Sequence, residues 1–441
     1  MRRSSIDTCL SLLRLGAPII VSQLGTIVVS FADTAMVGNY ATESLAAASF
    51  VNNLFNSALF TLMGFSYGVT PIVAALFSRG EKYAIGSTVR NGVLLNGMCG
   101  LLVIAVMTVL YFFIPYMGQP PELLPLIRPY YLIVLSSLVP LTIFGVFAQW
   151  SYGITRSKLP MWIIIGSNAL NILGNWLLIG GHWGMPELGL NGAGISTLLA
   201  RTACCVTLVW AFFAMRDFRD YRRGFIEKRP GGGERRRLLA TSWPVACQML
   251  FESGSFTVAA VICGTLGTLQ LASFQVIVCF GSLGFCIYYG LATAVAVMVA
   301  NASGRSDKPL MRHTAAAGYM LMLITAAISS SIFVLGGNTA ISFFTNDPAV
   351  MAMSATLLLP LVLYQFADAT QITFANALRG TARVRPMMGI AFVSYIVIGI
   401  PATYIMAHPL GWGVQGVVYS FTVSLMCAAA LFVYYFRKAT L

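Results

Sequence analysis

The sequence predicts an all-α integral membrane protein with about twelve transmembrane helices. Apolar residues make up 58% of the 441 positions and charged residues only 9%, whereas soluble domains carry about 25% charge. The mean hydropathy of the chain is +0.80. At roughly 20 residues for each span plus short loops, a chain of 441 residues holds about twelve helices. This composition excludes a set of soluble domains.

Twelve apolar segments are long enough to cross a bilayer. Several exceed 20 residues, which implies tilt or extension beyond the hydrocarbon. The first is too long for a signal peptide and carries Asp33, so we interpret it as a retained span. The expected spans are 12–37, 46–77, 88–114, 124–153, 160–180, 190–214, 238–263, 271–301, 311–343, 351–378, 386–406 and 413–435.

The basic residues predict the topology. Of 27 Lys and Arg residues, 25 fall in the N-terminal segment, the C-terminus and every second loop, and the loop after the tenth span is expected to hold Arg379, Arg383 and Arg385. Arg128 alone lies in the opposite loops, and Arg201 lies within a span. By the positive-inside rule both termini are cytoplasmic. The net charge of +13 therefore indicates topology and not a nucleic-acid partner.

The longest loop, 215–237, is the expected joint between two halves. It holds nine basic residues and the run Pro230-Gly231-Gly232-Gly233, which is typical of a flexible break. Its charge could bind anionic lipid or serve only as a topology determinant. We therefore expect an N-terminal six-helix bundle at 1–214, a basic cytoplasmic linker at 215–237 and a C-terminal six-helix bundle at 238–441.

The two halves repeat at an offset of 226 residues. Pro18 aligns with Pro244, and Arg79-Gly80-Glu81-Lys82 aligns with Arg305-Ser306-Asp307-Lys308. Because six spans separate the repeats, both start on the same side of the membrane. We expect two bundles related by a pseudo-two-fold axis along the membrane normal, an arrangement that commonly holds a substrate cavity.

Three acidic residues lie within predicted spans: Asp33, Glu252 and Asp368. A charge at mid-membrane is costly unless it faces protein or water, so we expect these carboxyl groups to face the interior. Tyr364 precedes Asp368 by about one helical turn and can face the same cavity. Glu252 and Asp368 could share a proton or, with further oxygen ligands, hold Na⁺.

The first half combines its single buried acid with amides. Asn171 and Asn175 are four residues apart and share a helix face, and Asn168 lies one turn earlier. Arg201 could pair with a helix end or a buried acid, or it could control the ionisation of Asp33.

Pro18 and Pro244 occupy corresponding spans. Each could kink its helix and act as a hinge, or lie without consequence near a helix start.

Motifs for other chemistry are missing. The sequence has no Walker A motif and no zinc-binding H-E-x-x-H, and its nine cysteines form no C-x-x-C pair. Gly64-Phe65-Ser66-Tyr67-Gly68 matches G-x-S-x-G, but it lies within a span and lacks the strand–turn–helix context of a nucleophile elbow. We expect no disulfide framework, no Cys/His metal site and no cofactor.

Several motifs, in their order and spacing, resemble the MATE (multidrug and toxic compound extrusion) transporters. The resemblance spans essentially the whole chain, and its second half is similar to the NorM branch. The segments that carry it are Ala17-Pro18-Ile19-Ile20, Phe31-Ala32-Asp33-Thr34-Ala35-Met36-Val37-Gly38, Leu45-Ala46-Ala47, Gly184-Met185-Pro186-Glu187-Leu188-Gly189, Leu250-Phe251-Glu252, Tyr364-Gln365-Phe366-Ala367-Asp368-Ala369 with Gln371, and Leu378-Arg379-Gly380.

This resemblance implies roles for single residues. Asp33 matches the family's first-span acid, with Asn171 and Asn175 as its polar neighbours, and Arg201 has no counterpart in the NorM branch. The positions that match the NorM cation site are Glu252, Tyr364 and Asp368.

The function that the resemblance implies is antiport. We expect a monomeric bacterial inner-membrane protein that is not an enzyme and that uses Na⁺ or H⁺ to export organic cations and other drugs. One alternative is a flippase for a lipid-linked precursor. A second is an intramembrane enzyme with Glu252 and Asp368 as its dyad.

Overall fold

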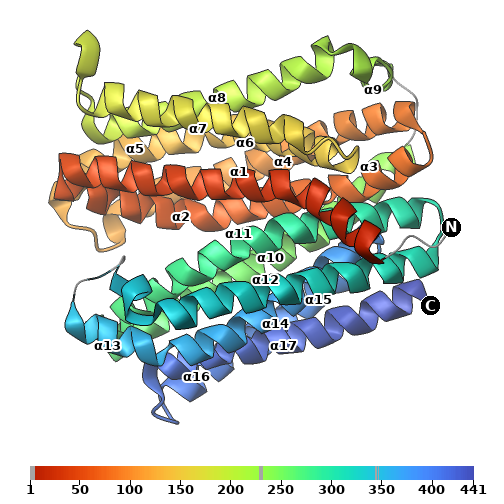
Figure 1. Cartoon of the computed structure of the whole chain (residues 1–441). Coiled ribbons are helices and arrows are strands. Elements are labelled where there is room, and N and C mark those ends of the chain that lie inside the picture. Colours follow the sequence, from red (N-terminus) through yellow and green to blue (C-terminus); the bar gives the residue numbers. More distant parts are fainter. Residues whose placement is uncertain (1–4, 228–231, 343–344, 346) are drawn as a thin grey trace. The chain divides into compact units, whose positions relative to one another are not determined.

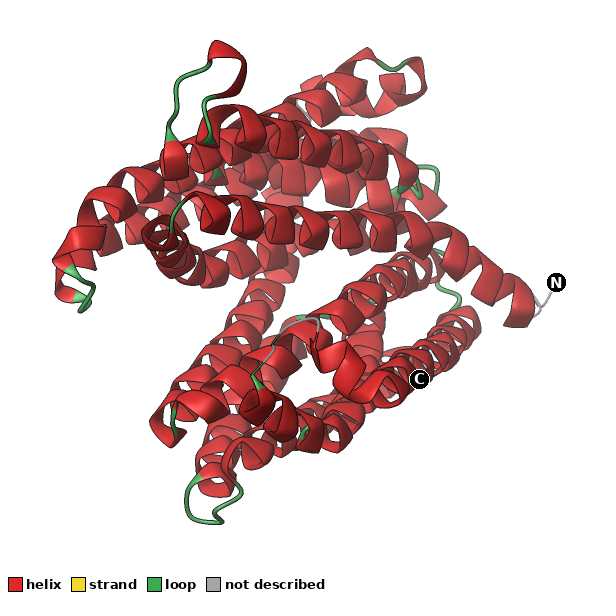
Figure 2. Cartoon of the chain, turned by 60° about the vertical axis from the view of Figure 1, so that its left-hand side comes forward, coloured by secondary structure: helices red, strands yellow, loops and turns green. Residues whose placement is uncertain are grey.

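The computed structural model describes residues 5–227, 232–342, 345 and 347–441. In this part of the chain every regular element is a helix and no strand occurs (Figure 2). This follows from the bilayer, in which backbone N–H and C=O groups have no water to bind and must be satisfied within each segment. Pro230 and Gly231 of the expected flexible break, together with Arg2 and Arg3, lie outside the described residues.

Thirteen elements precede residues 228–231, which the structure does not describe (Figure 1). The helices most relevant below are α1, α7 and α8, which carry the polar residues of the first half. The elements are α1 (Ser5–Tyr40), α2 (Thr42–Tyr67), α3 (Val69–Ser78), α4 (Lys82–Phe113), η1 (Ile114–Tyr116), η2 (Pro121–Leu123), α5 (Leu124–Ser136), α6 (Leu138–Gly153), α7 (Lys158–Ile179), η3 (His182–Gly184), α8 (Gly189–Ala214), η4 (Arg216–Phe218) and α9 (Arg219–Ile226).

The elements after this gap repeat the same pattern. The polar residues of the second half lie on α10, α11, α14 and the π-helix η5. The elements are α10 (Gly232–Leu266), α11 (Thr268–Gly304), α12 (Lys308–Ser342), α13 (Pro348–Thr356), α14 (Leu358–Gly380), α15 (Arg385–Ala391), η5 (Phe392–Gly399), α16 (Ile400–Ala407) and α17 (Gly413–Thr440).

The predicted number of spans is confirmed. Eleven described helices, or runs of adjoining helices, are long and apolar enough to cross a membrane. The pair α13 and α14, bent by 50°, makes a twelfth if it is one span. Most helices extend a few residues beyond the predicted spans because their polar ends continue past the apolar stretch, as in α1 and α17.

The repeat is visible in the element boundaries. The run of α2 and α3 covers 42–78 and α11 covers 268–304, which is the offset of 226 residues. The first run is broken at Gly68, whereas α11 is continuous. A Cβ at Gly68 would lie 2.3 Å from the Ser242 hydroxyl oxygen, so the glycine permits the close approach of α10 at this break.

Two compact units make up the chain. One consists of 21–246, and the other of 247–441 with the described residues up to 20. The first parts of α1 and α10 thus belong to the unit of the opposite repeat. In the second unit Gly16 packs on Gly290, where a Cβ on Gly16 would lie 3.2 Å from the Gly290 carbonyl oxygen. The division at 215–237 follows the repeat and stays a prediction.

Each unit has its own apolar core. In the first unit Phe55 and Tyr131 meet edge to face with ring centroids 4.8 Å apart, and the Tyr131 hydroxyl donates to the Met107 carbonyl at 2.6 Å. In the second unit Phe280 packs on Phe333 at 4.9 Å, and Phe274 lies in the same cluster.

The expected linker 215–237 is largely helical in the residues that the structure describes, whereas Pro230 and Gly231 of the expected flexible break lie outside them. It contains η4 and α9, and α10 begins at Gly232. Helix α9 packs directly on α4: a Cβ at Gly224 would lie 2.1 Å from the Tyr83 carbonyl oxygen, and Tyr221 is 5% exposed. The sequence did not predict this contact, because the pattern of the segment is dominated by its nine basic residues, and the contact is made by one small and one aromatic residue, Gly224 and Tyr221.

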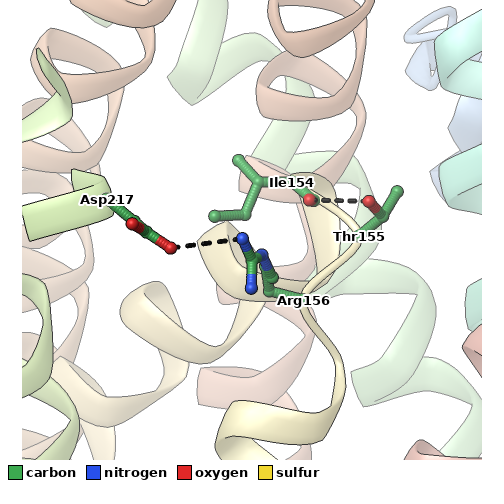
Figure 3. Close-up of polar contacts among 4 residues, drawn as sticks. All are labelled: Ile154, Thr155, Arg156 and Asp217. Atoms are coloured by element: carbon green, nitrogen blue, oxygen red, sulfur yellow. Dashed lines mark hydrogen bonds and ion pairs between the residues drawn. The ribbon is translucent and has the colours of Figure 1, made fainter. Parts of the chain in front are cut away.

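The ion pairs at this end of the first unit involve the same segment. Arg156, in the turn after α6, pairs with Asp217 at 3.4 Å (Figure 3). Lys82, at the start of α4, pairs with Asp220 at 3.1 Å. Both pairs are exposed, so each contributes little to stability but helps to orient α9.

Arg379 corrects the assignment of basic residues to loops. It lies in the last turn of α14 and is 3% exposed, not in the loop after the tenth span. Its guanidinium donates to the Asn376 side-chain oxygen at 3.0 Å. Arg383, by contrast, follows the helix and lies in the turn before α15.

Candidate functional site

Helices α1, α7 and α8 bring the polar residues of the first half together. The Asn175 side-chain amide donates to the Asp33 carboxylate and also approaches the Asn171 side-chain oxygen at 3.3 Å. Asn171 in turn donates to the Thr197 hydroxyl at 3.2 Å. Asn171 and Asn175 are buried, at 3% and 0% exposure. The spacing of these two asparagines thus places both on the face of α7 that meets α1 and α8.

Asn168 lies on the same helix but does not join this network. Its side-chain nitrogen is buried and has no hydrogen-bond partner in the described part of the chain. A Cβ at Gly25 would lie 2.9 Å from that nitrogen, so the glycine lets α1 pack against the amide. Asn168 therefore borders the Asp33 network without contacting Asp33.

Arg201 connects a helix break with the buried acid. Its guanidinium donates to the Ser137 hydroxyl at 2.7 Å, and that hydroxyl donates to the Val134 carbonyl at 2.6 Å. Ser137 is the residue between α5 and α6, so a cation meets the carbonyl end of α5, where it is favourable. The same guanidinium interacts electrostatically with Asp33 and Tyr130. The bond to Ser137 is a contact at a helix end, whereas Arg201 reaches Asp33 only electrostatically, and a role in controlling Asp33 stays a prediction.

In the second unit α10 and α14 bring two carboxyl groups together. Glu252 and Asp368 interact electrostatically, although 116 positions separate them. Asp368 is 3% exposed, and its Oδ2 atom has no hydrogen-bond partner among the described residues. The Gln248 side chain, one turn before Glu252, donates to the Glu252 carboxylate at 3.4 Å. Two carboxyl groups this close, in surroundings that are partly closed to water, cannot both ionise easily.

Aromatic hydroxyls lie within electrostatic reach of the carboxyl pair, and a buried amide, Gln365, follows Tyr364 on the same helix. Tyr364 interacts electrostatically with Asp368 and Glu252, and so does Tyr395 of η5. Gln365 is fully buried, and neither polar atom of its side chain has a partner in the described segments. Tyr288 of α11 lies near Asp368 and bonds the Ser329 hydroxyl at 2.8 Å. The cluster therefore offers oxygen atoms that are not already committed to other contacts.

A glycine and a π-helix allow the neighbouring helices to pack closely around these polar residues. A Cβ at Gly284 would lie 2.7 Å from the Gln365 side-chain oxygen, so α11 can approach the amide only through a glycine. The π-helix η5 places Tyr395 at 2% exposure, and π-helical turns are frequent at functional sites. Arg379 adds a buried cation within electrostatic reach of Glu252.

The sequence did not predict a role in the site for Tyr130, Thr197, Gln365, Tyr395 or Arg379, although Gln365 and Arg379 lie in motifs of the family resemblance. Signals existed for some of them. Thr197 lies one helical turn before Arg201, and Gln365 lies beside Tyr364. Tyr395 is a polar residue inside an apolar span, but nothing in its spacing indicates that it meets α10.

The remaining predicted features have clear positions. Pro18 and Pro244 lie buried inside α1 and α10, and both helices continue through them.

Ser66, the serine of the G-x-S-x-G match, is buried in α2. Its hydroxyl donates to the Leu62 carbonyl at 2.9 Å and accepts from Asn96 at 2.8 Å, so it does not form a nucleophile elbow. All nine cysteines, each in a described segment, are free. In the described residues no group of three or more His, Cys, Asp or Glu side chains could hold a metal ion.

Comparison with known proteins identifies the family. The family model MatE matches residues 18–177 and 244–405, one stretch in each repeat. The chain belongs to the MATE family. This confirms the resemblance found in the sequence.

Curated relatives of this MATE protein carry the name NorM. It is 29% identical over 428 residues to a probable multidrug resistance protein NorM of Xanthomonas campestris, which covers 97% of this chain and 93% of the relative. It is 30% identical over 427 residues to a probable multidrug resistance protein NorM of Rhizobium meliloti, which covers 95% and 91%.

Solved structures share the fold of the MATE protein. A MOP superfamily transporter from Pyrococcus furiosus superimposes with a TM-score of 0.89 at 17% identity, over 98% of this chain and 96% of the other. An outward-facing conformation of a multidrug resistance MATE family transporter of the MOP superfamily gives a TM-score of 0.90 at 17% identity, with the same coverage. The predicted fold class of a helical, multi-pass membrane protein is thus confirmed.

Proposed function

We propose that this MATE protein is a cation-coupled antiporter that exports organic cations and other drugs across the bacterial inner membrane. The observation that carries the proposal is the pair of Glu252, which is half-buried, and Asp368, which is buried and has one carboxylate oxygen without a partner among the described residues. Curated relatives named as multidrug resistance proteins support the choice of cargo.

The carboxyl pair suits a site that loads and releases a cation. Two carboxylates close together in a medium of low dielectric cannot both ionise easily, so one bound H⁺ or Na⁺ relieves their repulsion. Tyr364 supplies a further oxygen atom nearby, of the kind that a Na⁺ ion requires as a ligand. Release of the ion restores the repulsion, and this change in free energy is available to drive a conformational step.

The first unit differs in its electrostatics. Asp33 already interacts with a fixed cation, Arg201, and accepts a hydrogen bond from Asn175. We propose that Asn168, Asn171, Asn175 and Arg201 are the polar lining of the first bundle, and that Asp33 takes part in coupling when cargo or an ion competes with Arg201. Pro18 and Pro244 are proposed as hinges, since a proline inside a helix removes one backbone hydrogen bond.

The first test is drug export in cells. Cells that express this chain should accumulate less of a fluorescent organic cation than cells that express the Glu252→Gln, Asp368→Asn double variant. Equal accumulation in both, across several cations and fluoroquinolones, would contradict the proposal.

A flippase for a lipid-linked precursor is the second candidate. Two cations within the helical units, the half-buried Arg201 and the buried Arg379, could contact a phosphate, which is the observation in its favour. Transfer of a fluorescent lipid-linked substrate between leaflets of proteoliposomes, without any transport of organic cations, would favour this candidate. An intramembrane enzyme with Glu252 and Asp368 as its dyad would instead turn over a labelled peptide or lipid.

A further inference from the structure

A groove lies between the first half of α7 and the second half of α8, apart from the buried polar residues described above. It has a volume of about 580 Å³, within the roughly 300–1,000 Å³ of small-molecule sites. Side chains of these two helices line it, mainly with apolar atoms: Lys158, Trp162, Ile163, Leu170, Cys204 and Thr207. At its base the Ser167 hydroxyl donates to the Ala200 carbonyl at 2.7 Å, so this polar atom is satisfied.

The groove opens on an apolar helix face. On α8, Leu199, Val206 and Trp210 follow one another at helical spacing, and each is more than half exposed. In a segment that crosses a membrane, an exposed apolar face of this kind contacts acyl chains. The apolar walls of the groove therefore favour contact with acyl chains over contact with water.

One end of the groove has the composition of a membrane interface. Trp162, near the start of α7, and Trp210, near the end of α8, are both about two-thirds exposed, at 66% and 67%. Tryptophan is enriched at the level of lipid headgroups. Charged residues of the adjoining segments, Arg156 and Asp217, lie beyond this end of the two helices. Headgroups are thus expected at the level of Lys158.

Lys158 has a charge without a protein partner. Its basic neighbours are paired, Arg156 with Asp217 (Figure 3) and Lys82 with Asp220. Lys158 makes neither a hydrogen bond nor an ion pair with any residue that the structure describes, and its side chain is exposed at the mouth of the groove. At the headgroup level of a bilayer, the anion that is available to such an ammonium group is a lipid phosphate.

We propose that this groove binds one acidic phospholipid of the surrounding bilayer, with its phosphate at Lys158 and an acyl chain along Ile163 and Leu170. The glycerol region then lies beside Trp162. The groove does not include the carboxyl pair of the other unit. A failure of this proposal would therefore leave the transport proposal unaffected, and the reverse also holds.

Trp162 provides the measurement. The protein is reconstituted in phosphatidylcholine nanodiscs that contain either brominated phosphatidylglycerol or brominated phosphatidylcholine, and the signal of the Trp162→Phe variant is subtracted. We expect brominated phosphatidylglycerol to quench Trp162 at about fivefold lower content than brominated phosphatidylcholine, which corresponds to one lysine–headgroup contact. Lys158→Gln should remove this preference, and Lys158→Arg should keep it.

Lys438→Gln is the matched control, since Lys438 is also an exposed cation near the end of a spanning helix. It should leave the preference unchanged. Equal quenching by the two lipids in the wild-type protein would overturn the proposal. So would a preference that survives in Lys158→Gln, or one that Lys438→Gln removes to the same extent, because general surface charge would then be its source.

Discussion

Among single residues, Asn175 holds the carboxylate of a half-buried acid in place through one side-chain amide. Its side chain bonds the Asp33 carboxylate directly, whereas the neighbouring Asn168 has no partner within the described residues. A hydrogen bond to a charged group contributes about 1.5–3 kcal/mol. The two asparagines therefore form a natural pair of test and control.

Asn175→Ala should weaken the dependence of transport on the coupling ion. If Asp33 takes part in coupling, the ion concentration for half-maximal drug transport should shift by about tenfold or more, the equivalent of 1.4 kcal/mol or above. The measurement is transport against ion concentration in proteoliposomes. Asn168→Ala removes no hydrogen bond to Asp33, so it should leave the ion concentration for half-maximal transport unchanged, and an equal shift in both variants would argue against a specific role for Asn175.

Single residues also show how much of the site the sequence could predict. Asp33, Glu252 and Asp368 were predictable because a carboxyl group inside an apolar span needs an interior partner. Tyr395 and Arg379 were not, because their contacts depend on how a π-helix and the last turn of α14 pack against α10. Spacing along one helix cannot reveal a contact between helices that lie far apart in the chain.

Helix α9 is the element that departs most from the sequence-based expectation. Its two contacts with α4 are made through Gly86 and Gly224, where a Cβ would lie 2.0 and 2.1 Å from the nearest backbone oxygens. A short, strongly basic helix is hard to predict from composition, since its stability comes from this docking and not from its own apolar face. Helix boundaries elsewhere were predictable because the apolar stretches are long.

Gly224→Ala should therefore destabilise the docking of α9, by about 1–3 kcal/mol as for other overpacked contacts. Limited trypsin digestion should cut more rapidly after Arg222 or Arg223 in this variant than in wild type. Gly233→Ala is the control, because nothing lies within 4 Å of a Cβ at Gly233. Unchanged digestion of Gly224→Ala would show that α9 is not held by this contact.

Tyr221 gives the docking of α9 a pH dependence. Burial raises the pKa of its phenol above the ordinary value of about 10, so the folded state favours the neutral form. The stabilisation is complete below pH 10 and is lost as the pH rises through the raised pKa. The melting temperature should fall less steeply above pH 10 in Tyr221→Phe than in wild type. Parallel curves for the two proteins would exclude this contribution.

The whole molecule is predicted to have both termini and the basic loops in the cytoplasm. Glu81, just before α4, and Glu122, in η2 beyond the other end of α4, are both exposed, so each can report one side of the membrane. In intact cells a membrane-impermeant maleimide should label Glu122→Cys and should label Glu81→Cys only after permeabilisation. The native cysteines, all buried or partly buried in the described segments, provide the background control. The reverse labelling pattern would show that the predicted topology is wrong.

The asymmetry between the two repeats is the main feature of the molecule as a whole. The helices follow a common pattern, yet one unit holds the single acid Asp33 bonded to Asn175, whereas the other unit has the pair of carboxyl groups Glu252 and Asp368. The repeat, the number of spans and the family were predictable from the sequence, because they depend on apolar length and motif order. The exchange of the first parts of α1 and α10 between the units was not, since both helices are uninterrupted in the sequence pattern.

The most direct test of the account is drug transport in proteoliposomes with imposed gradients of Na⁺ or H⁺, applied separately. One of the two gradients should drive transport of an organic cation by the wild-type protein. Asp368→Asn and Glu252→Gln should each reduce gradient-driven transport by about tenfold or more, because each removes a carboxylate that holds the ion. Glu122→Gln, an exposed acid outside the site, should transport like wild type. Wild-type dependence on the gradient in Asp368→Asn and Glu252→Gln would contradict the assignment of the coupling site to this pair.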